Sequence, residues 1–149
     1  VVMLGRLPHS TGRARDLEIV HQAIDKVDVS HLTNASYPSL SGGEKQRVQL
    51  ARVLAQIWEE TGPGERYLLL DEPTAGMARA DTNATIDLLK EISATGITMV
   101  VIEHDMHVVF SLAERISVLA QGTVIVEDHP SQIKGNEKVQ EAYLGGAHL

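Results

Sequence analysis

Residues 40–52 read Leu-Ser-Gly-Gly-Glu-Lys-Gln-Arg-Val-Gln-Leu-Ala-Arg. Ser41 stands before two glycines and a helical pattern, and Glu44 follows three residues later, as in a capping box. Gly42 and Gly43 have no Cβ, so a ligand can approach their backbone closely. The first amides of a helix point outward at the positive end of its dipole, which suits a phosphate. The stretch predicts either an ordinary capped helix or a phosphate-binding helix start.

A second pattern lies at residues 67–72, where an apolar run ends in two carboxylates, Asp71 and Glu72. The run has the length of a strand buried on both faces. Ligands of open α/β sheets bind at the carboxyl ends of the strands. Two surface carboxylates at a strand end would be the plain alternative, but Pro73 and Thr74 follow here, and the glycine-led helix start precedes them.

The two patterns together resemble the signature motif and the Walker B motif of ATP-binding cassette (ABC) ATPases. The resemblance implies an α/β fold, a partial P-loop NTPase (ABC ATPase) fold with a mostly parallel sheet flanked by helices. A C-terminal β-hairpin and an N-terminal helical subdomain complete it. Residues 1–60 would form the helical subdomain with the signature, and residues 61–149 the C-terminal part of the RecA-like core.

The resemblance also implies roles for individual residues. ATP would be contacted by the signature residues Ser41, Gly42, Gly43, Glu44 and Gln46. Asp71 would hold Mg²⁺, an ion that prefers oxygen ligands. Glu72 would polarise the water that attacks the γ-phosphate. His104, which follows a β-branched run, would be the switch histidine that contacts the γ-phosphate. Its imidazole suits this role, since it can both donate and accept hydrogen bonds.

The sequence departs from the family pattern after Thr74. The family usually has Ser-Ala-Leu-Asp in the D-loop, where two ATPase subunits touch, whereas residues 75–78 read Ala-Gly-Met-Ala without an aspartate. Up to about Thr74 the chain resembles haemin-importer ATPases, and from Ala75 onward those of branched-chain amino-acid importers. A fusion or misassembled fragment would explain a seam at this point.

No Gly-x-x-x-x-Gly-Lys-[Ser/Thr] pattern occurs in the 149 residues. In the family, ATP lies between this Walker A loop of one subunit and the signature of the other. The resemblance thus covers the C-terminal portion of a nucleotide-binding domain, and Val1 is not an initiator methionine, so a fragment is expected. We expect the isolated chain to bind ATP weakly or not at all.

Composition narrows the classes of function. The net charge of −7 argues against a broad nucleic-acid-binding surface. The lack of cysteine excludes disulfides and thiolate metal sites. No apolar run reaches the length of a membrane span, and no signal peptide is visible. Any role at the membrane would therefore depend on partner proteins.

The leading interpretation is an ATP-hydrolysing subunit of an ABC importer that energises solute uptake. Its cofactors would be ATP and Mg²⁺, and its partners permease subunits and a second ATPase subunit, on the cytoplasmic face of the cell membrane. The helix at residues 16–29 and the segment before it would face the permease. A non-transport ABC ATPase is one alternative. A non-catalytic module that supplies a signature to an intact partner is another.

Periodicity places the elements around these motifs. Helices are expected at residues 16–29, 43–58, 79–94 and 105–113, strands at 67–70, 97–102, 116–119 and 123–126, and a weaker helical signal at 131–144. Both central strands, 67–70 and 97–102, are expected to be buried. Without the strand that precedes Walker A, the sheet would keep an exposed apolar edge, and we expect self-association or marginal stability.

Overall fold

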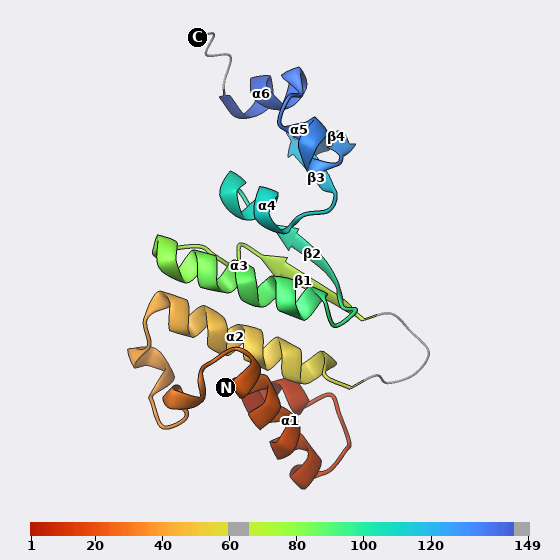
Figure 1. The fold of residues 1–149 in the computed structure, drawn as a ribbon. Helices are drawn as coiled ribbons and strands as arrows, with labels where there is room; N and C mark the ends of the chain where they lie inside the picture. Colours follow the sequence, from red (N-terminus) through yellow and green to blue (C-terminus); the bar gives the residue numbers. More distant parts are fainter. Residues whose placement is uncertain (60–65, 145–149) are drawn as a thin grey trace. The chain divides into compact units, whose positions relative to one another are not determined.

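The computed structural model describes residues 1–59 and 66–144, and it divides into two compact units, Val1–Glu103 and His104–Leu149 (Figure 1). The turn expected at residues 61–65, the boundary expected at residue 60 and the tail expected at 145–149 lie outside the described residues. The division into a helical subdomain and an ATPase core therefore stays a prediction.

The first unit begins with helices. Its elements are the 3-10 helix η1 (Val2–Arg6), α1 (Arg13–Lys26), the 3-10 helices η2 (Ser30–Leu32) and η3 (Tyr37–Ser39), and α2 (Gly42–Ile57). The periodicity of the sequence predicts Val48, Ala51, Ala55 and Trp58 on one face of α2, and this is largely confirmed, because the first three are buried. For α1 the periodicity predicts a stripe of Leu17, Val20, Ile24 and Val27. This is partly wrong, because Val20 and Val27 are buried but Leu17 is 38% exposed. Helix α1 also begins three residues earlier than expected.

A parallel strand pair follows. Strands β1 (Tyr67–Asp71) and β2 (Thr98–Ile102) pair in parallel, and helix α3 (Arg79–Ser93) connects them. A crossover helix is the usual connection between parallel strands. The pairing in register, with Leu69 opposite Val100 and Asp71 opposite Ile102, brings the carboxyl ends of the two strands to the same edge.

The expectation that both strands are buried is wrong. Leu68 is 2% exposed, but its neighbour Leu69 is 66% exposed, and Val100 and Ile102 are each 53% exposed. Side chains alternate between the two faces of a strand, and within the described residues only the face that carries Leu68 is well covered. One face of this pair is therefore an uncovered apolar surface.

The second unit contains α4 (Met106–Leu112), β3 (Ile116–Ala120), β4 (Thr123–Asp128), α5 (Pro130–Ile133) and α6 (Glu137–Leu144). The expected hairpin is confirmed: β3 and β4 are antiparallel, and Gln121 and Gly122 both have positive φ, at 48° and 76°. Two such residues form the tight turn that matches strand twist. The core of this unit consists of Ile116, Val118, Ile133 and Val139.

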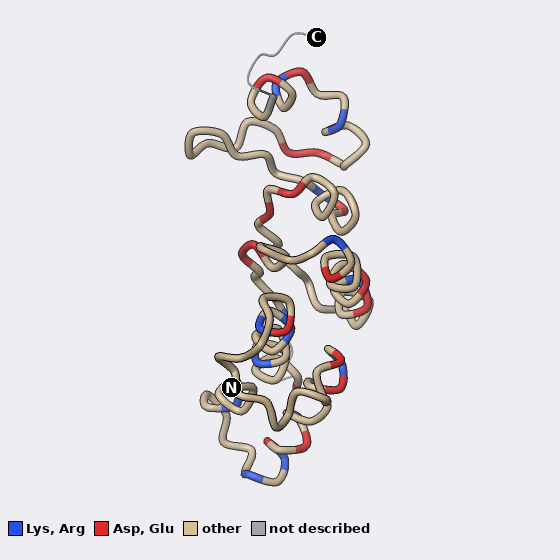
Figure 2. Tube along the Cα trace, turned by 90° about the vertical axis from the view of Figure 1, so that its left-hand side faces the viewer, with Lys and Arg blue, Asp and Glu red and all other residues tan. Residues whose placement is uncertain are grey.

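Positively and negatively charged residues are interspersed along the chain of the first unit (Figure 2). No helix within the described residues is long and apolar enough to cross a membrane.

Arg6 joins three parts of the helical region through one buried guanidinium. It is 3% exposed, and it donates to the Ala55 carbonyl of α2 at 2.8 Å and to Asp16 Oδ1 of α1 at 2.9 Å. A third partner, Glu59 Oε2, lies 3.1 Å from Nη2. A buried cation with this many acceptors fixes the relative positions of η1, α1 and the end of α2.

This cluster should make the first unit sensitive to acid. Hydrogen bonds from Thr11 and Arg6 lower the pKa of Asp16, and a hydrogen bond from Arg15 lowers the pKa of Glu59. A carboxylate whose pKa is lower in the folded state stabilises the fold above its unfolded pKa, and this contribution is lost as the pH falls through the folded value. Urea-unfolding midpoints should therefore fall as the pH drops through about 4, the pKa of free carboxyls, and below it.

Asp16→Asn is the matched variant for the acid experiment. It removes the titrating group and keeps the side-chain size. It should therefore lower stability at neutral pH and weaken the dependence of the unfolding midpoint on pH in the acid range. If the unfolding midpoint of the variant fell in acid as steeply as that of the unmodified chain, Asp16 would not contribute to the acid sensitivity.

Candidate functional site

The signature stretch forms a capped helix start, as the sequence predicts. Ser41 is the N-cap of α2: its Oγ accepts from Glu44 N at 3.3 Å, and its own backbone N donates to Glu44 Oε2 at 2.7 Å. Hydrogen bonds from the Ser41 backbone and side chain lower the pKa of Glu44. The reciprocal bonds satisfy two of the amides that a helix start leaves open.

Two further amides at this helix start remain available. Gly42 N and Gly43 N make no hydrogen bond within the part of the chain that the structure describes. Ser41 and Gly42 are exposed, while Gly43 is buried. An anion at the exposed end of α2 would meet the Gly42 N–H and the positive end of the helix dipole, with the unpaired Gly43 N–H in the more buried position behind it.

The helix start lies against the loop that follows β1. A Cβ on Gly42 would stand 3.8 Å from Gly76 O, and a Cβ on Gly43 would stand 3.4 Å from the carboxylate of Asp81 in the first turn of α3. The predicted signature and the predicted D-loop are thus neighbours in one chain. Sequence reasoning missed Asp81, because its pairing with Gly43 depends on the packing of two helices that are far apart in sequence.

The carboxylates Asp71 and Glu72 lie at the end of β1, as predicted, and both are exposed. Glu72 N donates to Ile102 O at 2.9 Å, and its φ of 46° is left-handed. Mg²⁺ is commonly bound through one or two carboxylates together with water and substrate phosphates. The exposed pair at a strand end fits that donor set, and the described residues contain no group of three or more metal-ligating side chains that would suit a different metal.

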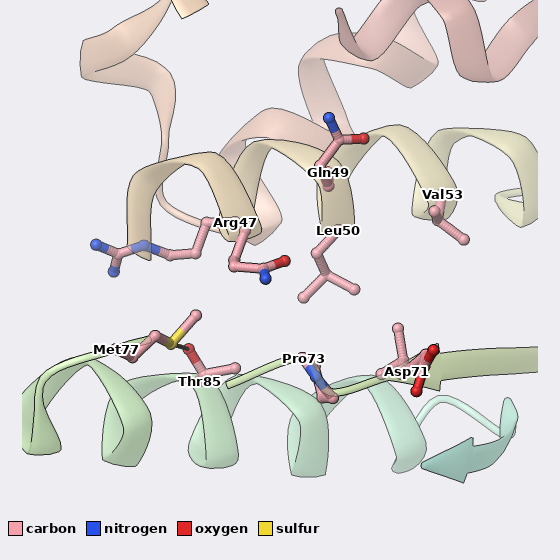
Figure 3. Close-up of a pocket in the computed structure, with 10 residues that line it drawn as sticks. Arg47, Gln49, Leu50, Val53, Asp71, Pro73, Met77 and Thr85 are labelled. Carbon is pink, nitrogen blue, oxygen red and sulfur yellow. Dashed lines mark hydrogen bonds between the residues drawn. The ribbon is translucent and has the colours of Figure 1, made fainter. Parts of the chain in front are cut away.

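A pocket of about 80 Å³ lies between α2 and the layer formed by β1 and α3 (Figure 3). Gln46 and Asp71, two of the predicted site residues, both line it. Leu50 and Val53 face Pro73 and Met77 across it (Figure 3). The signature helix and the end of the Walker B-like strand therefore border one cavity.

His104 opens the second unit, directly before Asp105, whose carboxylate caps α4 by accepting from His107 N at 2.8 Å. Glu72 and His104 thus belong to different units. The helix expected at residues 105–113 is confirmed as α4, and the role of His104 stays a prediction.

The comparisons with known proteins agree with the resemblance to ABC ATPases. A family model described as ABC transporter matches residues 6–75, and one described as branched-chain amino acid ATP-binding cassette transporter matches residues 123–149. The second match lies on the C-terminal side of Thr74, where the sequence resembles importers of that kind.

Two relatives are named hemin import ATP-binding protein HmuV. The one from Gloeobacter violaceus is 41% identical over 145 residues, covering 96% of this chain and 53% of that protein. The one from Pseudomonas fluorescens is 47% identical over 124 residues, covering 82% of this chain and 47% of that protein. The chain spans about half the length of these curated relatives, and the likeness to the first of them extends well beyond Thr74.

A solved structure described as an inward-facing conformation of a metal-chelate type ABC transporter has the same fold. It superposes with a TM-score of 0.82 at 24% identity, covering 97% of this chain and 57% of that chain.

Proposed function

Because the chain belongs to the ATP-binding family of ABC transporters, we propose that it works as an ATP-hydrolysing subunit of an ABC importer. The observation that carries the proposal is the start of α2, where a complete capping box leaves the Gly42 and Gly43 amides open. These amides would bind phosphate oxygens of an ATP molecule held by a second subunit.

The end of β1 would serve a different ATP molecule. Asp71 would hold Mg²⁺, which neutralises phosphate charge when it is bound, and Gln46 would help to orient the signature helix. Glu72 would accept a hydrogen bond from the attacking water, and His104 would contact the γ-phosphate. These roles follow from the family motifs, and the exposure of both carboxylates supports them.

The partners would be membrane permease subunits and a second ATPase subunit, with the chain bound peripherally at the cytoplasmic side of the membrane. Support comes from the hemin-import relatives, which are named as ATP-binding proteins of an import system. The helical region around η1 and α1 would face the permease. Exposed apolar residues on η1, Leu4 at 53% and Met3 at 39%, are consistent with a contact surface there.

A complementation assay tests the proposal. The chain alone should show no micromolar affinity for ATP in a binding titration, because a phosphate grip of the Walker A type is not found in its sequence. It would then be mixed with a full-length hemin-import ATPase subunit that keeps its Walker A loop but carries an inactivated signature. Hydrolysis should recover with increasing amounts of the chain, because the chain supplies the missing signature.

Failure to recover hydrolysis at any ratio of the two proteins would contradict the proposal. Micromolar ATP binding by the chain alone would contradict the expectation about its isolated form. An unmodified pair of intact subunits sets the activity that full recovery should approach.

A further inference from the structure

The turn after β1 is fastened by a side chain from the end of β2. Thr74 N donates to Glu103 Oε1 at 3.0 Å, and Thr74 Oγ1 donates to the same oxygen at 2.6 Å. Thr74 is 7% exposed and Glu103 is half-buried, so this contact is partly shielded from water. Hydrogen bonds to an ionised carboxylate are about twice as strong as neutral ones. The pair is therefore a firm connection between two loops that are far apart in sequence.

The same turn contains a residue in an unfavourable conformation. Glu72 has a φ of 46°, in the left-handed region that residues other than glycine seldom occupy. Such a conformation persists only when the surrounding structure fixes it. Glu72 N donates to Ile102 O at 2.9 Å, and Glu72 O accepts from Ala75 N at 3.1 Å.

The hydrogen bonds around Glu72 lead to Thr74 and from there to Glu103. Thr74 lies within the turn that Glu72 O and Ala75 N close, and Thr74 O accepts from Met77 N at 3.2 Å. If Thr74 were released, the turn could relax and Glu72 could leave the left-handed region. Glu103 also directly precedes His104 in the chain and directly follows Ile102, the acceptor for Glu72 N.

We propose that Glu103 is a positioning residue that holds the Glu72 backbone in its left-handed conformation through Thr74. Glu103 does not itself contact substrate in this scheme. It fixes the direction in which the Glu72 carboxylate leaves the end of β1. The importance of that direction for catalysis rests on the proposed function, in which Glu72 orients the attacking water.

The test is a nuclear magnetic resonance measurement on the 149-residue chain. It records amide hydrogen exchange at Glu72, Ala75 and Met77, and the HN–Hα coupling of Glu72, which reports its φ. Glu103→Ala should speed exchange at these amides by about tenfold or more, the factor expected for one lost charge-assisted hydrogen bond, and should shift the coupling. Glu103→Gln keeps an acceptor oxygen and should bring both readouts back toward those of the unmodified chain.

A second pair of variants decides the question if Glu103→Ala does not fold. Thr74→Val keeps the shape of the side chain and loses the hydroxyl donor, so it should speed amide exchange at Glu72 and shift the Glu72 coupling. Thr74→Ser keeps the donor and should leave Glu72 as it is. Glu141→Ala, at an exposed glutamate of α6, is the control for removing a carboxylate and should change nothing at Glu72.

Two results would overturn the proposal. One is unchanged exchange and coupling at Glu72 in Glu103→Ala or Thr74→Val. The other is an equal rise in exchange at Leu89, which is fully buried in α3 and reports general loosening of the unit. None of these measurements uses ATP, so a failed complementation assay would refute the proposed function and leave this result standing.

Discussion

A chain carrying Gly42→Asp should fold at least as stably as the unmodified chain and should lose about 100-fold or more of the hydrolysis recovered in the complementation assay. Gly42 is exposed, and the nearest atom to a Cβ at this position is Gly76 O at 3.8 Å, so the new side chain has room. An acidic residue in the first turn of a helix also interacts favourably with the dipole.

The expected loss of activity has the same physical origin as the expected gain in stability. The new carboxylate would lie beside the Gly42 and Gly43 amides and repel an incoming phosphate, and losing the stabilisation of a charged transition state commonly costs a factor of this size. Thermal unfolding and hydrolysis are measured on the same preparation. Gly42→Ala, which adds a methyl group without charge, is the control and should retain most of the activity.

If Gly42→Asp recovered hydrolysis as well as the unmodified chain, the helix start would not be a phosphate site. A parallel loss of stability and activity would instead indicate damage to the fold and would contradict the argument from available space.

Replacing Gly5 with alanine should destabilise the first unit by roughly 2–4 kcal/mol, in the upper range for overpacking. A Cβ on Gly5 would stand 2.1 Å from the Arg52 carbonyl oxygen and 3.4 Å from the Ala55 Cβ. The first of these atoms belongs to the backbone of α2, which cannot move aside as a flexible side chain can. Helix η1 would have to separate from α2, and Arg6 would lose its position in the same step.

Urea unfolding measures this effect. Gly135→Ala is the matched control, because nothing lies within 4 Å of a Cβ at Gly135, and that variant should shift the midpoint little. Equal midpoints for the two alanine variants would mean that η1 does not pack on α2 in the way described.

Features that depend on neighbours in the sequence could be predicted from it. The capping box follows from the spacing of Ser41 and Glu44, and the hairpin follows from Gln121 and Gly122 between two β-branched runs. The strand that ends in Asp71 was recognisable because an apolar run stops at a carboxylate. Such signals act over a few residues and need no knowledge of tertiary packing.

Features that depend on distant neighbours could not be predicted. The bond between Thr74 and Glu103 joins residues 29 positions apart, and the approach of Asp81 to Gly43 depends on how α2 and α3 pack. The exposure of Leu69 was also hidden, because residues 68–70 are all leucine and show no alternation that would distinguish the two faces of β1. The assigned roles of Glu72 and His104 stay predictions for the experiments above.

The uncovered sheet face that carries Tyr67, Leu69, Val100 and Ile102 has a practical consequence for anyone who handles this protein. If copies of the chain associate through such a face, each copy acts as a stabilising ligand for the next. The melting temperature would then rise with protein concentration, by mass action. Dilution would weaken the folded state, and a melting curve would describe the molecule only together with the concentration at which it was recorded.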